Sequence, residues 1–93
     1  MAEKPVLKLS ESVDISISEQ LHEQLEALLQ AGGDVVIDAQ AVERIDTTVF
    51  QLLFSFQQTL AKQHSKSLIV SPSPSFMANA TLLGLHNELN IQL

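Results

Sequence analysis

The sequence has 93 residues, of which 45% are hydrophobic, so it encodes one globular domain with a single core rather than a disordered chain. Eleven acidic residues against five basic ones give a net charge of −6. This charge excludes the basic surface typical of nucleic-acid binding and disfavours binding to an anionic membrane. The chain has no cysteine, so disulfides and thiol chemistry are excluded.

The first part of the chain predicts two strands, a helix and a buried strand. Residues 6–9 are predicted to form a strand, and residues 12–15 a short second one. Ser16 and Glu19 match a capping box, so a helix is expected to start there and to end at Gly32 and Gly33. Its apolar face comprises Leu21, Leu25, Leu28 and Leu29. Residues 34–38 form a strand with a continuous apolar centre, which favours burial on both faces of a sheet.

A loop over residues 39–46 is expected to lead into a second helix, from about residue 48 to residue 63. Phe50 and Phe54 lie beside its apolar stripe and either widen the core face or form an aromatic patch for a partner. The stripe itself comprises Val49, Leu52, Leu53, Phe56 and Leu60.

The last part of the chain predicts a strand, a third helix and an edge strand. Residues 68–70 form another buried strand, and Ser73 or Ser75 is expected to cap the helix that follows. Residues 89–93 alternate apolar and polar, as an edge strand does. The helix is expected to end at Gly84 and to carry Phe76, Met77, Ala80, Leu82 and Leu83.

The order of elements is therefore β-β-α-β-α-β-α-β over residues 1–93. Strands that alternate with helices predict right-handed crossovers and a mostly parallel sheet. We expect a single α/β domain with about four or five strands and three or four helices.

Residues that could support catalysis do not gather in the sequence. His22, His64 and His86 are scattered without the spacing of metal ligands. Neither a Gly-rich phosphate loop nor a Gly-x-Ser-x-Gly motif is present. We expect no enzyme activity, no metal and no cofactor. Asp38 ends a buried strand, where it is either a phosphoacceptor or an acceptor of hydrogen bonds from the following loop.

The sequence also lacks a targeting or membrane signal. No apolar segment of the kind found in signal peptides follows the first six residues, and the apolar runs are too short to span a bilayer. We expect a cytoplasmic protein without membrane insertion.

Residues 44–52 are the most informative segment. Asp46, Thr47 and Thr48 lie where a loop becomes a helix, next to unpaired backbone N–H groups and the positive end of the helix dipole. Asp46 or Thr47 is either only an N-cap, or part of a site where a phosphorylated hydroxyl is electrostatically favoured.

The chain resembles the STAS domain family, which is named for sulfate transporters and anti-sigma factor antagonists. The resemblance rests on the order of elements and on the sequences of residues 36–42 and 45–53. Residues 74–75 and 82–85 look like the family's third helix. The resemblance covers nearly the whole chain and implies a free-standing bacterial regulator. In anti-sigma factor antagonists the hydroxyl residue after the motif's Asp is phosphorylated; that residue is Thr47 here, beside Asp46. Val49 stands where the family often has glycine, and a bulkier surface there favours an unphosphorylated scaffold role.

The resemblance implies two functions. The first is a non-enzymatic antagonist that binds an anti-sigma factor or a regulatory serine kinase and is released when Thr47 is phosphorylated. The second is an accessory subunit that binds the ATPase of an ABC-type lipid transporter, as some small STAS proteins do. The partner-binding candidates are Arg44, Asp46, Thr47, Thr48, Phe50 and Gln51.

Overall fold

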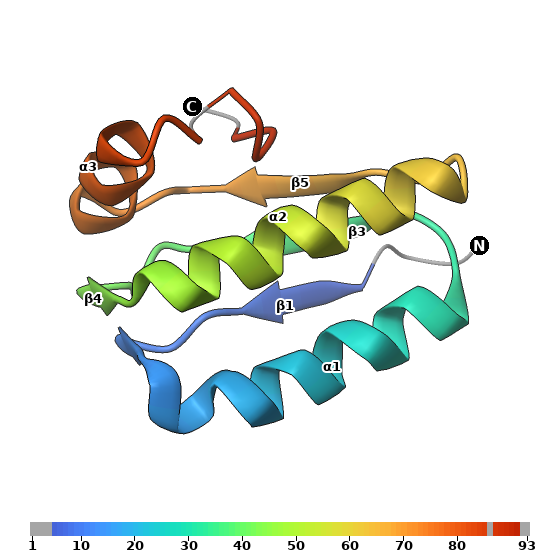
Figure 1. Ribbon diagram of the computed structural model, residues 1–93, viewed down its shortest axis with the longest axis horizontal. Coiled ribbons are helices and arrows are strands. Elements are labelled where there is room, and N and C mark those ends of the chain that lie inside the picture. The colour runs from blue at the N-terminus through green and yellow to red at the C-terminus, as the bar shows by residue number, and fades with distance from the viewer. Residues whose placement is uncertain (1–4, 86, 92–93) are drawn as a thin grey trace.

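The main sheet has three parallel strands in the order β1-β3-β5 (Figure 1). The structure is a computed structural model that describes residues 5–85 and 87–91. The strands are β1 (Val6–Lys8), β3 (Val35–Asp38) and β5 (Ser67–Val70). Two shorter strands, β2 (Ser12–Val13) and β4 (Arg44–Ile45), form a separate parallel pair. The α-helices are α1 (Ser18–Ala31), α2 (Thr47–Lys62) and α3 (Pro74–Leu82). The predicted mostly parallel α/β fold is therefore confirmed.

Helices α1 and α2 lie side by side over one face of the main sheet (Figure 1). On this face the strand register aligns Leu7, Ile37 and Ile69, and the last two are fully buried. On the opposite face, Val36 and its register partner Leu68 are only half-buried. The expectation that residues 34–38 are buried on both faces is therefore wrong, because burial alternates with the pleat of the strand.

Helix α2 buries four of the five residues of the predicted stripe, and Phe50 takes the place of Leu52 in the fifth position. Phe50 is fully buried, whereas Leu52 is half-buried and Phe54 stays half-buried beside the core. The ring of Phe50 lies 5.0 Å from the ring of Phe76 in α3, a distance typical of a packed aromatic pair. This contact draws Phe50 into the core. The prediction that Phe50 belongs to a partner-binding surface is therefore wrong.

The start of α1 also differs from the capping-box prediction. Ile17 is the N-cap residue and makes no side-chain capping bond, while Ser16 lies in a preceding 3₁₀ turn, η1 (Ile15–Ile17). The hydroxyl and the N–H of Ser16 both donate to the Asp14 carboxylate, which lowers the pKa of Asp14. The Asp14 carboxylate therefore accepts the hydrogen bonds that stabilise this turn, whereas Ser16 was expected to be the capping residue.

Two other segments depart from expectation. Residues 39–46, expected to form a loop, contain β4, which is too short to leave a periodic signal. Of the strand expected over residues 89–93, residues 89–90 lie in a turn and Ile91 forms a parallel bridge with Ile69, while residues 92–93 lie outside the described residues. Ser73 caps α3 as expected, since its Oγ accepts from the N–H of Phe76 at 3.1 Å.

The burial of Phe50 gives a test of the core. Phe50→Ala should lower the free energy of unfolding by about 3–5 kcal/mol, the usual cost of removing a buried aromatic ring. Urea denaturation followed by circular dichroism measures this change. The neighbouring exposed residue provides the control, because Gln51→Ala should change stability by less than about 0.5 kcal/mol. Equal stability of the two variants would contradict the core position of Phe50.

Candidate functional site

The start of α2 is fixed by Asp46. Its Oδ1 accepts from the N–H of Thr48 at 3.1 Å, which satisfies one of the unpaired donors of the first helical turn. Its backbone N–H donates to the carbonyl oxygen of Val13 at 2.9 Å, next to the β2–β4 pair. The Asp46 side chain thereby caps the helix, and its backbone N–H ties the helix start to strand β2.

Thr47 and Thr48 are the first two residues of α2, and both are exposed. Asp46 already occupies the N-cap position, so neither threonine is needed as the cap. Asp46 is therefore the residue that caps the helix. Thr47 presents its side chain to solvent at the positive end of the helix dipole.

Thr47 lies at the edge of an open groove of about 290 Å³. Gln51, one turn further along α2, lines the same groove. The apolar part comes from half-buried Phe54 and Leu85 and from Leu83, which is 41% exposed. A hydroxyl thus borders a surface with the mixture of apolar and polar groups that protein interfaces use.

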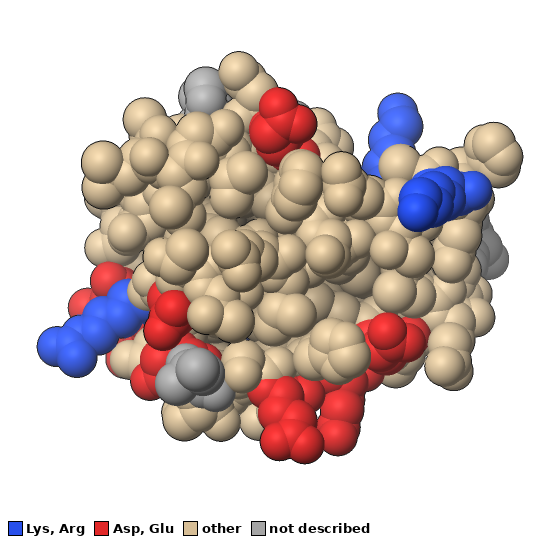
Figure 2. Space-filling view, viewed as in Figure 1, with Lys and Arg blue, Asp and Glu red and all other residues tan. Residues whose placement is uncertain are grey.

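The surface over α2 is unusually poor in charge. No Asp, Glu, Lys or Arg occurs between Thr47 and Ala61, and the only charged residue of the helix is Lys62 in its last turn. Figure 2 shows the centre of this face without charged side chains, with acidic ones along its lower edge. Depletion of charge over a continuous face is a property of interface centres.

Two exposed leucines lie at the end of α3, and one of them, Leu83, lines the groove with Thr47. Leu82 and Leu83 are expected on the third helix from the sequence, and the structure shows Leu82 84% exposed at the end of α3. The helix stops before Gly84, where φ is +70°, so the chain turns and leaves these side chains outside. The sequence carries no local signal that separates these two leucines from the buried residues of the same helix.

The remaining sequence-predicted residues divide between surface and core. Arg44 on β4 and Gln51 on α2 are exposed, and the chain brings Arg44 within two residues of Asp46. Val49, however, is fully buried. The expectation that Val49 adds bulk to the surface a kinase would approach is therefore wrong, because its side chain packs into the core.

Other chemical candidates do not come together. The Asp38 carboxylate accepts from the N–H of Gln40 at 2.9 Å, the loop contact that was its structural interpretation. His22 and His64 are exposed on separate segments, and His86 lies outside the described residues. Within residues 5–85 and 87–91, no group of three His, Cys, Asp or Glu side chains is arranged to hold a metal ion.

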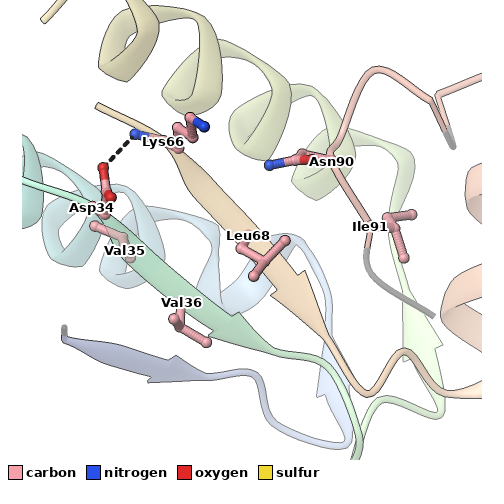
Figure 3. Close-up of a pocket in the computed structure, with 7 residues that line it drawn as sticks. All are labelled: Asp34, Val35, Val36, Lys66, Leu68, Asn90 and Ile91. Carbon is pink, nitrogen blue, oxygen red and sulfur yellow. Dashed lines mark hydrogen bonds between the residues drawn. The ribbon is translucent and has the colours of Figure 1, made fainter. Parts of the chain in front are cut away.

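A larger cavity, about 510 Å³, lies at the other end of the main sheet (Figure 3). Its lining includes Asp34, whose carboxylate accepts from the N–H of Lys66 at 2.9 Å, and aliphatic side chains such as Val36 and Leu68. This cavity is separate from the start of α2, and its lining residues include none of the candidate site residues.

The fold and the site together define a small α/β domain with an uncharged, partly apolar surface around a helix start. A family model described as "Mlab, STAS domain" matches residues 1–92, so the chain belongs to the STAS domain family. Domains of this family generally mediate protein–protein interactions and are generally non-enzymatic.

A solved structure shows the same fold. The NMR structure of the protein TM1081 aligns with a TM-score of 0.81 at 16% sequence identity, covering 94% of this chain and 71% of that chain. A comparison with curated proteins finds no match. Among the described residues, no helix has the length and apolar character needed to cross a membrane.

The capping role of Asp46 can be measured. Asp46→Ala should lower the free energy of unfolding by about 1 kcal/mol, because the N–H of Thr48 loses its acceptor. Asp46→Asn retains an oxygen acceptor at the same place and should recover most of this loss. Thermal and urea denaturation of both variants are the measurements, and equal losses in the two would contradict capping by the side chain.

Proposed function

We propose that this protein is a non-enzymatic signalling regulator that binds a protein partner through the face formed by the start of α2 and the end of α3. The observation that carries this proposal is the groove at which Thr47 and Gln51 meet Phe54, Leu83 and Leu85. Its partner is an anti-sigma factor or a regulatory serine kinase, by analogy with anti-sigma factor antagonists.

Phosphorylation of Thr47 would act on this complex through desolvation. A phosphate adds about −1.5 to −2 charges at neutral pH. At Thr47 this charge would stand beside the Asp46 carboxylate and next to the apolar lining given by Phe54 and Leu83. A partner that buries a neutral hydroxyl would then bury a charge without a matching cation, at a cost of several kcal/mol. Since about 1.4 kcal/mol changes affinity tenfold, one phosphate is sufficient to release the partner.

A second candidate function is an accessory subunit on the ATPase of an ABC-type lipid transporter. The observation in its favour is the composition of the same face, because α2 is uncharged from Thr47 to Ala61 and Leu83 is 41% exposed in the groove beside it. Apolar, charge-poor surfaces are typical of permanent complexes. In this function the affinity would not depend on phosphate at Thr47.

Capture from a native lysate distinguishes the two functions. The tagged protein and its Gln51→Arg variant serve as paired baits, and mass spectrometry identifies proteins lost with the variant. An anti-sigma factor or serine kinase supports the first function, and an ABC ATPase supports the second. If the two baits retain the same proteins, the face formed by the start of α2 and the end of α3 is not the partner surface.

The identified partner then allows a test of Thr47. Thr47→Ala should retain binding within about threefold, because the partner still meets a small uncharged group. Thr47→Glu should weaken binding by a factor of ten or more, roughly 1.4 kcal/mol, because it introduces a charge at the groove. Isothermal titration calorimetry measures both affinities, with thermal unfolding to establish that the variants fold. Unchanged binding of Thr47→Glu would argue against control by phosphorylation.

A further inference from the structure

A second groove lies between α1 and α2 and uses residues that the proposed partner surface does not. Its floor is apolar, made by buried Leu25 and Phe56 together with half-buried Leu29 and Leu52. Its volume is about 170 Å³, which suits one long side chain rather than a small-molecule ligand. The groove is therefore shaped to accept a single projecting side chain.

The polar residues at the edge of this groove favour a cation. Glu26 is about half exposed there, and it lies near His22, with Nε2 to Oε1 at 3.9 Å. That separation is at the outer limit of an ion pair, and the histidine is charged only when protonated. On the opposite wall, the hydroxyl of Thr59 is already engaged, since it donates to the carbonyl oxygen of Ser55 at 3.0 Å. Glu26 thus offers a carboxylate beside an apolar floor.

The surroundings of the groove strengthen this preference. Helix α1, which forms one wall of the groove, contains three acidic residues and no Lys or Arg. Along α1, Glu19, Glu23 and Glu26 follow the spacing i, i+4 and i+7, which places them on one side of the helix over about 10 Å. Figure 2 shows acidic side chains along this lower edge of the molecule, beside the uncharged face of α2.

We propose that the α1–α2 groove binds an arginine-bearing, amphipathic helical segment of a protein partner. The methylene groups of one arginine lie over Leu29 and Leu52, and its guanidinium meets the Glu26 carboxylate. Arginine fits better than lysine because its planar head bonds a carboxylate at two points and is less strongly hydrated. Further cationic residues on the same helix face pair with Glu19 and Glu23. This surface goes beyond the proposed function and does not depend on the state of Thr47.

A titration with a defined peptide tests the proposal. The probe is a synthetic, acetylated and amidated helical peptide with leucine and arginine on one face, added to ¹⁵N-labelled full-length protein at low ionic strength. The control peptide replaces each arginine with citrulline, which keeps the shape and removes the charge. We expect amide shifts to change in residues 22–29 and 52–59, and binding of the citrulline peptide to be weaker by a factor of about ten or more.

Matched variants locate the contact. Ser55 is exposed on α2 at the groove, so Ser55→Arg should place a cation in the groove and abolish binding, while Ser55→Ala should leave it unchanged. Glu26→Gln should weaken binding about fivefold, and Glu88→Gln, which removes an acid that does not line the groove, should change it less than twofold. Thermal unfolding of each variant establishes that the fold is retained.

Four outcomes would overturn the proposal. Equal binding of the citrulline peptide would assign the groove to an uncharged apolar segment. Equal effects of Glu26→Gln and Glu88→Gln would indicate general attraction to an acidic protein. Concentration-dependent shifts at the same residues without peptide would assign the groove to a second copy of the chain. No shift change at millimolar arginine peptide would show that the groove binds no such segment.

Discussion

The contact between Phe50 and Phe76 determines most of what α2 can present to a partner. Both rings are fully buried, and they join α2 to α3 across the core. Because Phe50 turns inward, Leu52 moves to the α1 side of α2 and Phe54 to the groove with Leu83. The Phe50–Phe76 pair and the rest of the buried stripe of α2 together set which side chains line the two open grooves.

The parts of the fold that could be predicted from sequence are those with a long, regular hydrophobic pattern. The α1 and α2 helices, the β3 and β5 strands and the Ser73 cap of α3 all follow from local spacing and turn chemistry. The misplaced cap at Ser16 is a local failure, whereas the burial of Phe50 depends on a contact between distant segments. Nothing in residues 44–62 indicates that Phe76 will pack on Phe50, and a two-residue strand such as β4 has no period to detect, whereas β2 follows from the strand expected over residues 12–15.

The candidate site was predicted only in part, because sequence patterns report local features and not contacts between distant segments. Asp46, Thr47 and Thr48 are recognisable from the change of loop into helix, which is a local feature. Phe54, Leu83 and Leu85 join Thr47 only because α3 ends beside α2 in the fold. A helical pattern also assigns every apolar residue to the core, so the 84% exposure of Leu82 could not be read from it. The chemistry of the helix start was local, whereas the apolar surface around it depends on the tertiary structure.

The structural and regulatory interpretations of residues 46 and 47 are compatible. A capping carboxylate must sit one residue before the helix, and this position directs the next residue, Thr47, outward at N1. The cap also fixes the hydroxyl relative to Gln51 and Phe54, because Asp46 is held both by Thr48 and by the carbonyl of Val13. A phosphate added at Thr47 would meet a helix end whose N–H of Thr48 is already occupied by a carboxylate. The added charge would consequently be balanced poorly by the protein itself, and its main effect would fall on whatever molecule covers the groove.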